Sequence, residues 1–331
     1  MKKGNPWALL PILCFLVVFI GMGVWLNDFY AMPAIVGFLI ALGVAFCQNR
    51  KRSFSEKMED VTHSMGDSNV MIMCLVFVMA GGFSGAVQAA GGVDSTVNFS
   101  LSILPPSVAV AGLFIIGCFI STAMGTSVGT IAALAPIAVG ISDKTGIAGA
   151  LCIGAVVSGA MFGDNLSFIS DTTIAATRTQ EVSMKDKFKA NILMVLPAVV
   201  INVILLAIQS GGDVSLGNIG SFSFVNIIPY ILVIALSLVG LNVVVVMIIG
   251  ILSGVVIGCF NGGFTLIQSL TIIHDGAIGM EDMALIAVMV GGMVELMKHF
   301  GGMDFLMNQL TKGAKSSRGG ELSIAALVSL L

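Results

Sequence analysis

The sequence predicts an all-α fold, a polytopic transmembrane helical bundle, and two observations carry that prediction. Hydrophobic residues make up 57% of the 331 residues and charged residues only 10%, whereas soluble domains carry about 25% charge. Apolar runs long enough to cross a bilayer also recur along the chain. They cover residues 7–25, 32–47, 69–90, 107–141, 147–177, 189–209, 224–240, 242–259 and 282–297, and another opens at Leu322. The expected partner is the lipid bilayer. With a net charge of −3 and no basic domain, we expect no binding to nucleic acid.

Lysine and arginine gather in alternate connections between these runs. They occur at the N-terminus, in Arg50–Lys57, in Arg178–Lys189 and in Lys312–Arg318, but not in the connections 26–31, 91–106, 210–223 and 260–281. The positive-inside rule then places the N-terminus in the cytoplasm. On this count 107–141 is one crossing that ends inside at Asp143-Lys144. The run 147–177 must then enter and return as a re-entrant helical hairpin that breaks near Gly163.

An internal repeat relates the two halves of the chain at an offset of 210 residues. Residues 79–94 and 289–304 both contain two glycine pairs ten residues apart, and each ends on an aspartate, Asp94 or Asp304. The crossing directions make the halves inverted repeats, an arrangement that many secondary transporters use to build a site at mid-membrane. We expect one transporter domain over 1–331, with a first repeat at about 7–209. The second repeat, at about 224–331, is expected to be incomplete and to lack its C-terminal helices.

The stretch from Gly163 to Thr173 is the most polar part of this apolar surrounding. Seven of its eleven side chains carry oxygen: Asp164, Asn165, Ser167, Ser170, Asp171, Thr172 and Thr173. Charged groups at membrane depth cost about 2.5–3.5 kcal/mol each on insertion scales, so such a cluster marks a functional site. If the stretch is helical, Asp164 and Asp171 lie two turns apart and share a face with Ser167. We expect these oxygens to bind Na⁺, with Asp164 and Asp171 as its carboxylate ligands.

A second polar stretch, Ser121–Thr130, interrupts the long run 107–141. It combines five hydroxyls with Gly125 and Gly129 and is followed by Pro136. Small residues also let helices pack closely, so packing alone is an alternative explanation for the two glycines. The pattern favours a broken helix in which Gly125, Thr126, Ser127 and Thr130 supply further ligands to a hard cation.

The buried aspartates suggest how a proton could be exchanged for a cation. Burial raises the pKa of a carboxyl group and a nearby cation lowers it, so one aspartate can hold either H⁺ or Na⁺. Alternatives remain for several acids. Asp164 could be a helix N-cap, Asp94 could cap the Gly-Gly-Val-Asp turn, and Glu295 could pair with Lys298 on one helix. The six cysteines and three histidines lack the spacing of a disulfide framework or a metal site.

The two polar stretches resemble the NhaC-type family of bacterial Na⁺/H⁺ antiporters. The family's Gly-Asp-x-x-Ser-x-x-Ser-Asp-Thr-Thr pattern is matched at every position from Gly163 to Thr173, and its Gly-Thr-Ser pattern at Gly125–Ser127. The resemblance covers about residues 30–330. It implies an inverted-repeat transporter with hairpins and broken helices. Family members also include exchangers of organic acids such as malate and lactate, and Na⁺-coupled amino-acid transporters.

The leading functional hypothesis is a secondary transporter in the bacterial inner membrane, a Na⁺/H⁺ antiporter that exports Na⁺ against inward H⁺. The alternative keeps the Na⁺ site and adds a small organic anion or amino acid as substrate. An intramembrane aspartyl protease is a remote alternative, because such enzymes carry Gly-x-Gly-Asp where this chain has Met161-Phe162-Gly163-Asp164. We therefore expect a transporter rather than an enzyme, with no cofactor beyond the transported ions. A homo-oligomer stays open.

Overall fold

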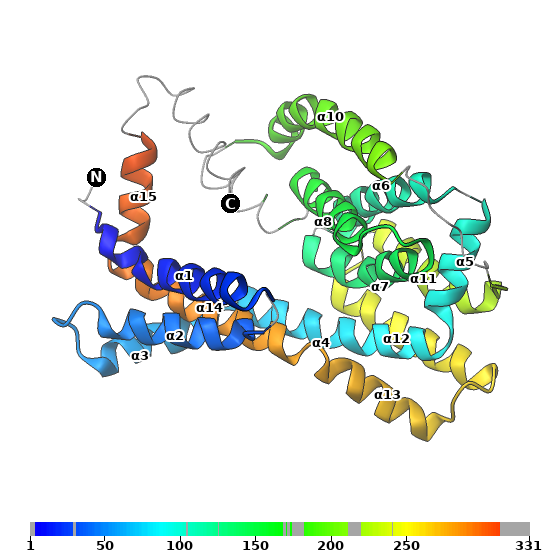
Figure 1. The fold of residues 1–331 in the computed structure, drawn as a ribbon, viewed down its shortest axis with the longest axis horizontal. Coiled ribbons are helices and arrows are strands. Elements are labelled where there is room, and N and C mark those ends of the chain that lie inside the picture. The colour runs from blue at the N-terminus through cyan, green and yellow to red at the C-terminus, as the bar shows by residue number, and fades with distance from the viewer. Residues whose placement is uncertain are drawn as a thin grey trace. The chain divides into compact units, whose positions relative to one another are not determined.

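The computed structural model describes residues 4–28, 31–103, 105–124, 126–167, 170, 173, 182–210, 220–239 and 241–311. Every regular element in these ranges is a helix (Figure 1). The helices are η1 (Pro6–Leu9), α1 (Leu10–Leu26), α2 (Ala34–Cys47), α3 (Phe54–Met65), α4 (Ser68–Ala89), α5 (Gly92–Ile103), α6 (Pro106–Met124), α7 (Ser127–Thr145), α8 (Gly149–Leu166), α10 (Met184–Gln209), α11 (Phe224–Leu238), α12 (Val243–Phe260), α13 (Leu266–Ile278), α14 (Glu281–His299) and α15 (Gly302–Thr311).

The predicted all-helical, multi-pass membrane fold is confirmed. Six helical segments among the described residues are long and apolar enough to cross a bilayer. They are Pro6–Leu26, Ser68–Ala89, Gly149–Leu166, Lys185–Gln209, Val243–Phe260 and Leu266–His299. A seventh candidate is the pair α5 and α6, which is bent by 118° at its break.

The chain forms two compact parts. Unit 1 contains Met1–Cys74 and Asp282–Leu331, and unit 2 contains Leu75–Glu281. In unit 1, α1 and α2 pack through stacked rings of Phe15 and Phe38, whose centroids are 4.0 Å apart. The basic connection after α2 continues into α3, which begins with a capping box between Ser53 and Glu56. Such reciprocal hydrogen bonds satisfy the free N–H groups of the first turn.

A charged cluster in unit 1 surrounds Asp60 of α3. Arg52 Nη1 lies 2.5 Å from Asp60 Oδ2, and His299 Nδ1 lies 2.9 Å from the same oxygen. Burial raises the pKa of Asp60, but the hydrogen bonds from His299 and Arg52 outweigh it and hold this pKa below its ordinary value. The predicted pairing of Glu295 with Lys298 is confirmed at 3.4 Å.

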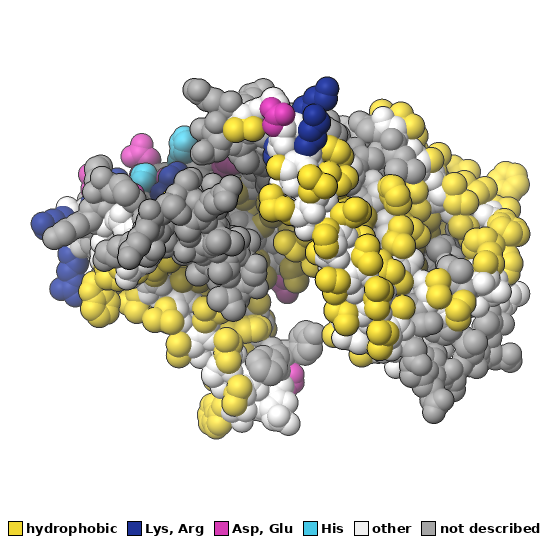
Figure 2. Space-filling view, turned by 90° about the horizontal axis from the view of Figure 1, so that it is seen from above, with side chains coloured by type: hydrophobic (Ala, Val, Ile, Leu, Met, Phe, Trp, Pro, Cys, Tyr) yellow, Lys and Arg dark blue, Asp and Glu magenta, His cyan; other side chains and the backbone are white. Residues whose placement is uncertain are grey.

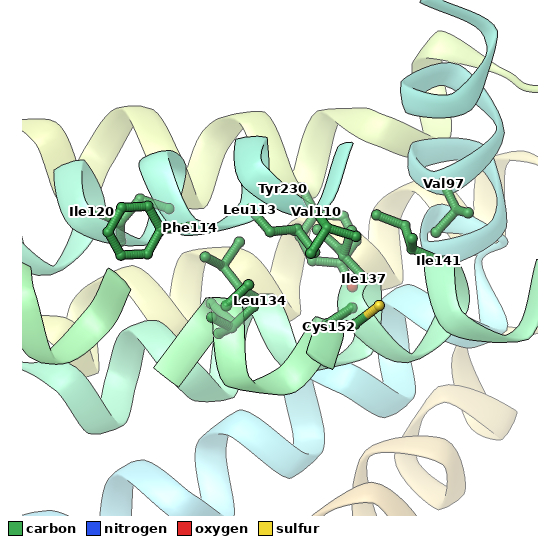
Figure 3. Packing of buried hydrophobic residues seen from close by; sticks show 14 of the residues in the cluster. Val97, Val110, Leu113, Phe114, Ile120, Leu134, Ile137, Ile141, Cys152 and Tyr230 are labelled. Atoms are coloured by element: carbon green, nitrogen blue, oxygen red, sulfur yellow. The ribbon is translucent and has the colours of Figure 1, made fainter. Parts of the chain in front are cut away.

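The core of unit 2 lies among α6, α7, α8 and α11 (Figure 3). Along α6 the labelled side chains run from Val110 to Ile120, and along α7 from Leu134 to Ile141 they run in the opposite direction. The two helices are therefore an antiparallel hairpin. The predicted break in the run 107–141 is confirmed, because α6 ends at Met124 and α7 begins at Ser127.

The prediction that 107–141 is a single crossing is wrong. Lys144 Nζ lies 2.8 Å from Asp94 Oδ1 and 2.8 Å from Asn98 Oδ1, so the end of α7 has returned to α5. Asp143-Lys144 and Asp94 consequently belong to the same side, whereas the loop charges had placed them on opposite sides. With two passages in 107–141 instead of one, a single passage by 147–177 brings the chain to the cytoplasmic side that Arg178 requires. The loop charges therefore no longer require 147–177 to fold back. The second arm expected there lies mostly outside the described residues.

Local geometry recurs at the offset of the sequence repeat. Gly91 and Gly301 both adopt positive φ, at 74° and 86°, in the turns after α4 and α14. A short helix follows each turn one residue later and carries Asp94 or Asp304 in its first turn. Glycine is suited to these turns because other residues pay for a left-handed backbone. The inverted relation of the two halves stays a prediction.

The outer surface of unit 2 has the character of a lipid-facing surface. Leu193 and Met194 of α10 expose 76% and 70% of their surface, and Ile208 exposes 68%. Figure 2 shows hydrophobic side chains over much of the visible surface of this unit. In water, an apolar surface of this extent would be costly, so it fits the predicted bilayer environment.

Candidate functional site

The candidate site begins with a close contact between α6 and α8. A Cβ atom on Gly163 would lie 2.6 Å from both Ser121 Cβ and Thr122 N, and one on Gly159 would collide with the Phe114 carbonyl. Residues 114 and 118 of α6 thus face residues 159 and 163 of α8, so the two helices run in parallel. Glycines four residues apart allow such close approach in membranes. Because the helices are parallel, their C-terminal ends meet.

Hydroxyl groups from the α6–α7 turn gather at this end. Ser121 Oγ donates to the Ala160 carbonyl at 2.5 Å, and Thr122 Oγ1 donates to the Cys118 carbonyl at 2.7 Å. At the start of α7, Thr130 Oγ1 donates to the Thr126 carbonyl at 2.9 Å. Each of these hydroxyls gives its proton to a carbonyl and keeps lone pairs, so it can still accept a hydrogen bond or coordinate a cation. Ser121 and Thr130 are fully buried.

The end of α8 supplies the acid and amide groups. Asp164 and Asn165 lie in its last turn, and Ser167 follows as the C-cap. Ser167, Ser170 and Thr173 are all buried, with at most 3% of their surface exposed. The last turn of α8, which packs on α6 through Gly163, therefore carries a carboxylate and an amide and is followed by buried hydroxyls.

The first turns of α10 complete the site. Lys187 Nζ donates to the Asn165 carbonyl and, at 2.7 Å, to Thr173 Oγ1. Asn191 Nδ2 donates to Asn165 Oδ1 at 3.0 Å. The Asp164 carboxylate acts electrostatically on the Lys187 ammonium. A positive side chain therefore lies among the oxygens that the sequence assigned to a cation.

The structure corrects several details of the predicted site. Asp164 is not an N-cap, because it lies in the last turn of α8. A single helix carrying Asp164 and Asp171 on one face is also wrong, since Ser167 and Ser170 lie outside any helix. The break comes after Leu166 rather than at Gly163, whose missing side chain serves packing. Asp171, Thr172 and Gly125 lie outside the described residues.

Sequence reasoning missed Lys187 and Asn191. Lys187 was counted only as part of a basic connection that orients the chain. The signal that could have found them is their spacing of four residues at the start of the run 189–209. That spacing puts both side chains on one face of a helix, so a lysine and an amide can reach the same neighbour.

Chemically, the arrangement sets a tethered ammonium, that of Lys187, among oxygen atoms. Carbonyl, hydroxyl and carboxylate oxygens are ligands for hard monovalent ions. The Lys187 ammonium uses some of the same oxygens. A buried polar site at the broken ends of membrane helices defines the class of membrane proteins that transport small solutes.

Comparisons with known proteins agree with that class. A model of the Na⁺/H⁺ antiporter family matches residues 5–211. The chain is 25% identical to the malate-2H⁺/Na⁺-lactate antiporter of Bacillus subtilis, over 99% of this chain and 76% of the relative. It is 28% identical to the Na⁺/H⁺ antiporter NhaC of Alkalihalophilus pseudofirmus, over 72% and 58%. It is 26% identical to the arginine/ornithine antiporter ArcD of Halobacterium salinarum, over 61% and 41%. No solved structure matches.

The chain belongs to the Na⁺/H⁺ antiporter family, which confirms the resemblance to NhaC-type proteins. It is a membrane transport protein rather than an enzyme. It spans about three quarters of the first relative and less than two thirds of the other two.

Proposed function

We propose that this chain carries the cation site of a secondary antiporter that exports Na⁺ in exchange for inward H⁺. The observation that carries the proposal is the close packing of α6 on α8, which sets the buried Ser121 hydroxyl on the Ala160 carbonyl, one turn before Asp164, together with the Lys187 ammonium on the Asn165 carbonyl. The family match to residues 5–211 supports it, because that range contains all these groups. Asp171 and Thr172, with Gly125, belong to the proposed site by resemblance.

The proposed exchange uses one carboxylate for two ions. Na⁺ binds when Asp164 is ionised and coordinates the oxygens of Ser167, Ser170 and Thr173 with the hydroxyls of Thr126, Ser127 and Thr130. A proton on Asp164 removes the charge that holds Na⁺. Lys187 competes with Na⁺ for the Asn165 carbonyl and Thr173 Oγ1. It can thus neutralise the site while no Na⁺ is bound, which lowers the cost of an empty charged site in the membrane.

Everted membrane vesicles test the proposal. Na⁺ should dissipate a ΔpH across vesicles containing the unmodified protein, and the Asp164→Asn and Asp171→Asn proteins should lose this response. Asp67→Asn is the matched control, because Asp67 lies in unit 1 and its carboxylate accepts a hydrogen bond from the Asn69 N–H at the start of α4. Full Na⁺-dependent activity in Asp164→Asn would sink the assignment.

A second candidate function is Na⁺-coupled exchange of an organic acid or amino acid. Lys187 favours it, since an ammonium at 2.7 Å from Thr173 Oγ1 could bind a substrate carboxylate. The match of 99% of this chain to a malate/lactate antiporter also favours it. Uptake of ²²Na⁺ into proteoliposomes separates the two functions: stimulation by a carboxylate or amino acid selects the exchanger, and its absence selects Na⁺/H⁺ antiport.

A further inference from the structure

A cavity of about 660 Å³ lies within unit 2 between α4, α5 and α7. Its α7 lining begins at Val128, in the first turn, and includes Ala132, Pro136 and Val139 before it ends at Lys144. This spacing of three to four residues follows one face of the helix along its whole length. The cavity, called here the α7 cavity, therefore runs from Val128, which directly follows Thr126–Ser127 in the chain, to the opposite end of the hairpin.

The charged end of the α7 cavity attracts cations. Asp94, Asp143 and Lys144 line it. Lys144 is paired with Asp94 and also donates to Asn98, so its charge is already neutralised. Asp143 has no ion-pair partner in the part of the chain that the structure describes. The lining carries two carboxylates and one ammonium, a net charge of −1 that concentrates cations and repels anions.

Oxygen atoms continue along the cavity. Ser84 and Gln88 of α4, one turn apart, both line it. On the α7 side, Pro136 has no N–H and cannot donate the helix hydrogen bond to the Ala132 carbonyl, and both residues line the cavity. At about 30 Å³ for each water molecule, the volume has room for roughly 20 waters. A hydrated cation consequently finds both space and oxygen ligands between the two ends.

We infer that the α7 cavity is the route by which a monovalent inorganic cation passes from Asp143 to the Thr126–Thr130 turn. An intermediate binding position along this route is formed by Ser84, Gln88 and the Ala132 carbonyl. The inference rests on the proposed function. To that function it adds the access path of the cation and Asp143 as the group that selects for positive charge. Much of the lining is apolar, so a lipid chain is the competing occupant. The net negative charge at the end of the cavity favours the cation.

Thiol labelling tests the route in the full chain. In a cysteine-free background, single substitutions Ala135→Cys and Val139→Cys place a thiol on the cavity wall, and Ala138→Cys places one in the buried core of the same helix. Both wall thiols should react with the cationic reagent 2-(trimethylammonio)ethyl methanethiosulfonate, and Ala138→Cys should not. Each labelling rate is divided by the rate of the same reagent with a free thiol in solution. After this correction, the cationic reagent should react about threefold or more faster than the anionic 2-sulfonatoethyl reagent. Adding Asp143→Asn should abolish that preference.

Transport gives an independent measurement. Ala135→Phe, which fills the middle of the cavity, should lower the rate of Na⁺ exchange about tenfold or more while the protein elutes as a folded species. Unreactive wall thiols, equal rates for the two reagents, or full exchange by a folded Ala135→Phe protein would each overturn the route. If the cysteine-free chain exchanges no Na⁺ but shows charge-selective labelling, the proposed function fails and the cavity stands as a path for another cation.

Discussion

The two ends of the α6–α7 hairpin solve the problem of polar groups in a membrane in different ways. At the turn, the groups are short and mostly neutral, and hydroxyls such as Ser121 and Thr130 are fully buried with their protons given to backbone carbonyls. At the opposite end, the groups are charged, and the Asp94 side chain is 75% exposed. Where a charge does occur near the turn, at Asp164, a lysine accompanies it. Burial therefore selects neutral oxygens, and full charges need either water or a partner.

The largest expected effect comes from filling the contact at the turn end. Gly163→Val should destabilise the protein by about 3 kcal/mol or more, because the new side chain collides with α6 and no flexible atom can yield. Thermal unfolding in detergent measures this. Gly154→Val is the matched control, since a Cβ on Gly154 of the same helix meets nothing within 4 Å. Equal stability of the two variants would contradict the close packing of α6 on α8.

Removing the tethered cation should change ion affinity more than stability. In Lys187→Met, the ammonium that competes with Na⁺ for the Asn165 carbonyl and Thr173 Oγ1 is removed, and the apparent KM for Na⁺ should fall about tenfold, or about 1.4 kcal/mol. Initial rates of Na⁺-dependent exchange at varied Na⁺ give this value. Lys185→Met, an exposed lysine two residues away, should leave KM unchanged. A higher KM in Lys187→Met would show that the lysine supports Na⁺ binding rather than competing with it.

Asp60 offers a further test of the rule that a buried charge needs a partner. It is a largely buried acid outside the apolar spans, and Arg52 and His299 compensate its charge. Its pKa is lowered in the folded protein, so it stabilises the fold above the unfolded pKa of about 3.9 and loses this contribution as pH falls through the folded value. Replacing it by asparagine should cost about 1 kcal/mol at neutral pH and flatten the acid limb of stability. Unfolding curves from pH 3 to 7 check this, and an unchanged acid limb would refute it.

The smallest effect is expected at the open end of the hairpin. Asp94→Asn removes the partner of Lys144, yet the acid is 75% exposed, so stability should change by less than about 1 kcal/mol. The same thermal assay used for Gly163→Val measures it. A loss as large as that of Gly163→Val would mean that the charges at this end hold the hairpin together, and the contrast between the two ends would disappear.

Much of this molecule could be predicted from its sequence. Apolar runs identified the spans, and the hydroxyls and glycines from Ser121 to Thr130 identified the break between α6 and α7, because both signals are local. The direction of the chain after that break could not be predicted. A run of 35 residues fits one tilted crossing or two helices, and loop charge cannot separate these options when the connection that follows carries a single lysine, Lys144.

The site was predicted in its oxygen-bearing residues but not in its contacts. The pattern from Asp164 to Thr173 is visible because polar residues are rare in an apolar chain. The parallel packing of α6 on α8, which brings Ser121 to Ala160, depends on helices that are 39 residues apart in sequence. Lys187 escaped notice because lysines at the ends of spans usually serve orientation. Only tertiary structure shows that its ammonium reaches back to Asn165.

The return of α7 to the side of α5 has a consequence for how such chains can change in evolution. Since the hairpin leaves and re-enters on one side, it adds an even number of passages, and everything after Gly149 keeps its orientation whether or not the pair is present. Reporter enzymes fused after Ala90 and after Lys144 should accordingly indicate the same compartment. A helix pair with this property can be gained, lost or lengthened as a module without inverting the rest of the protein.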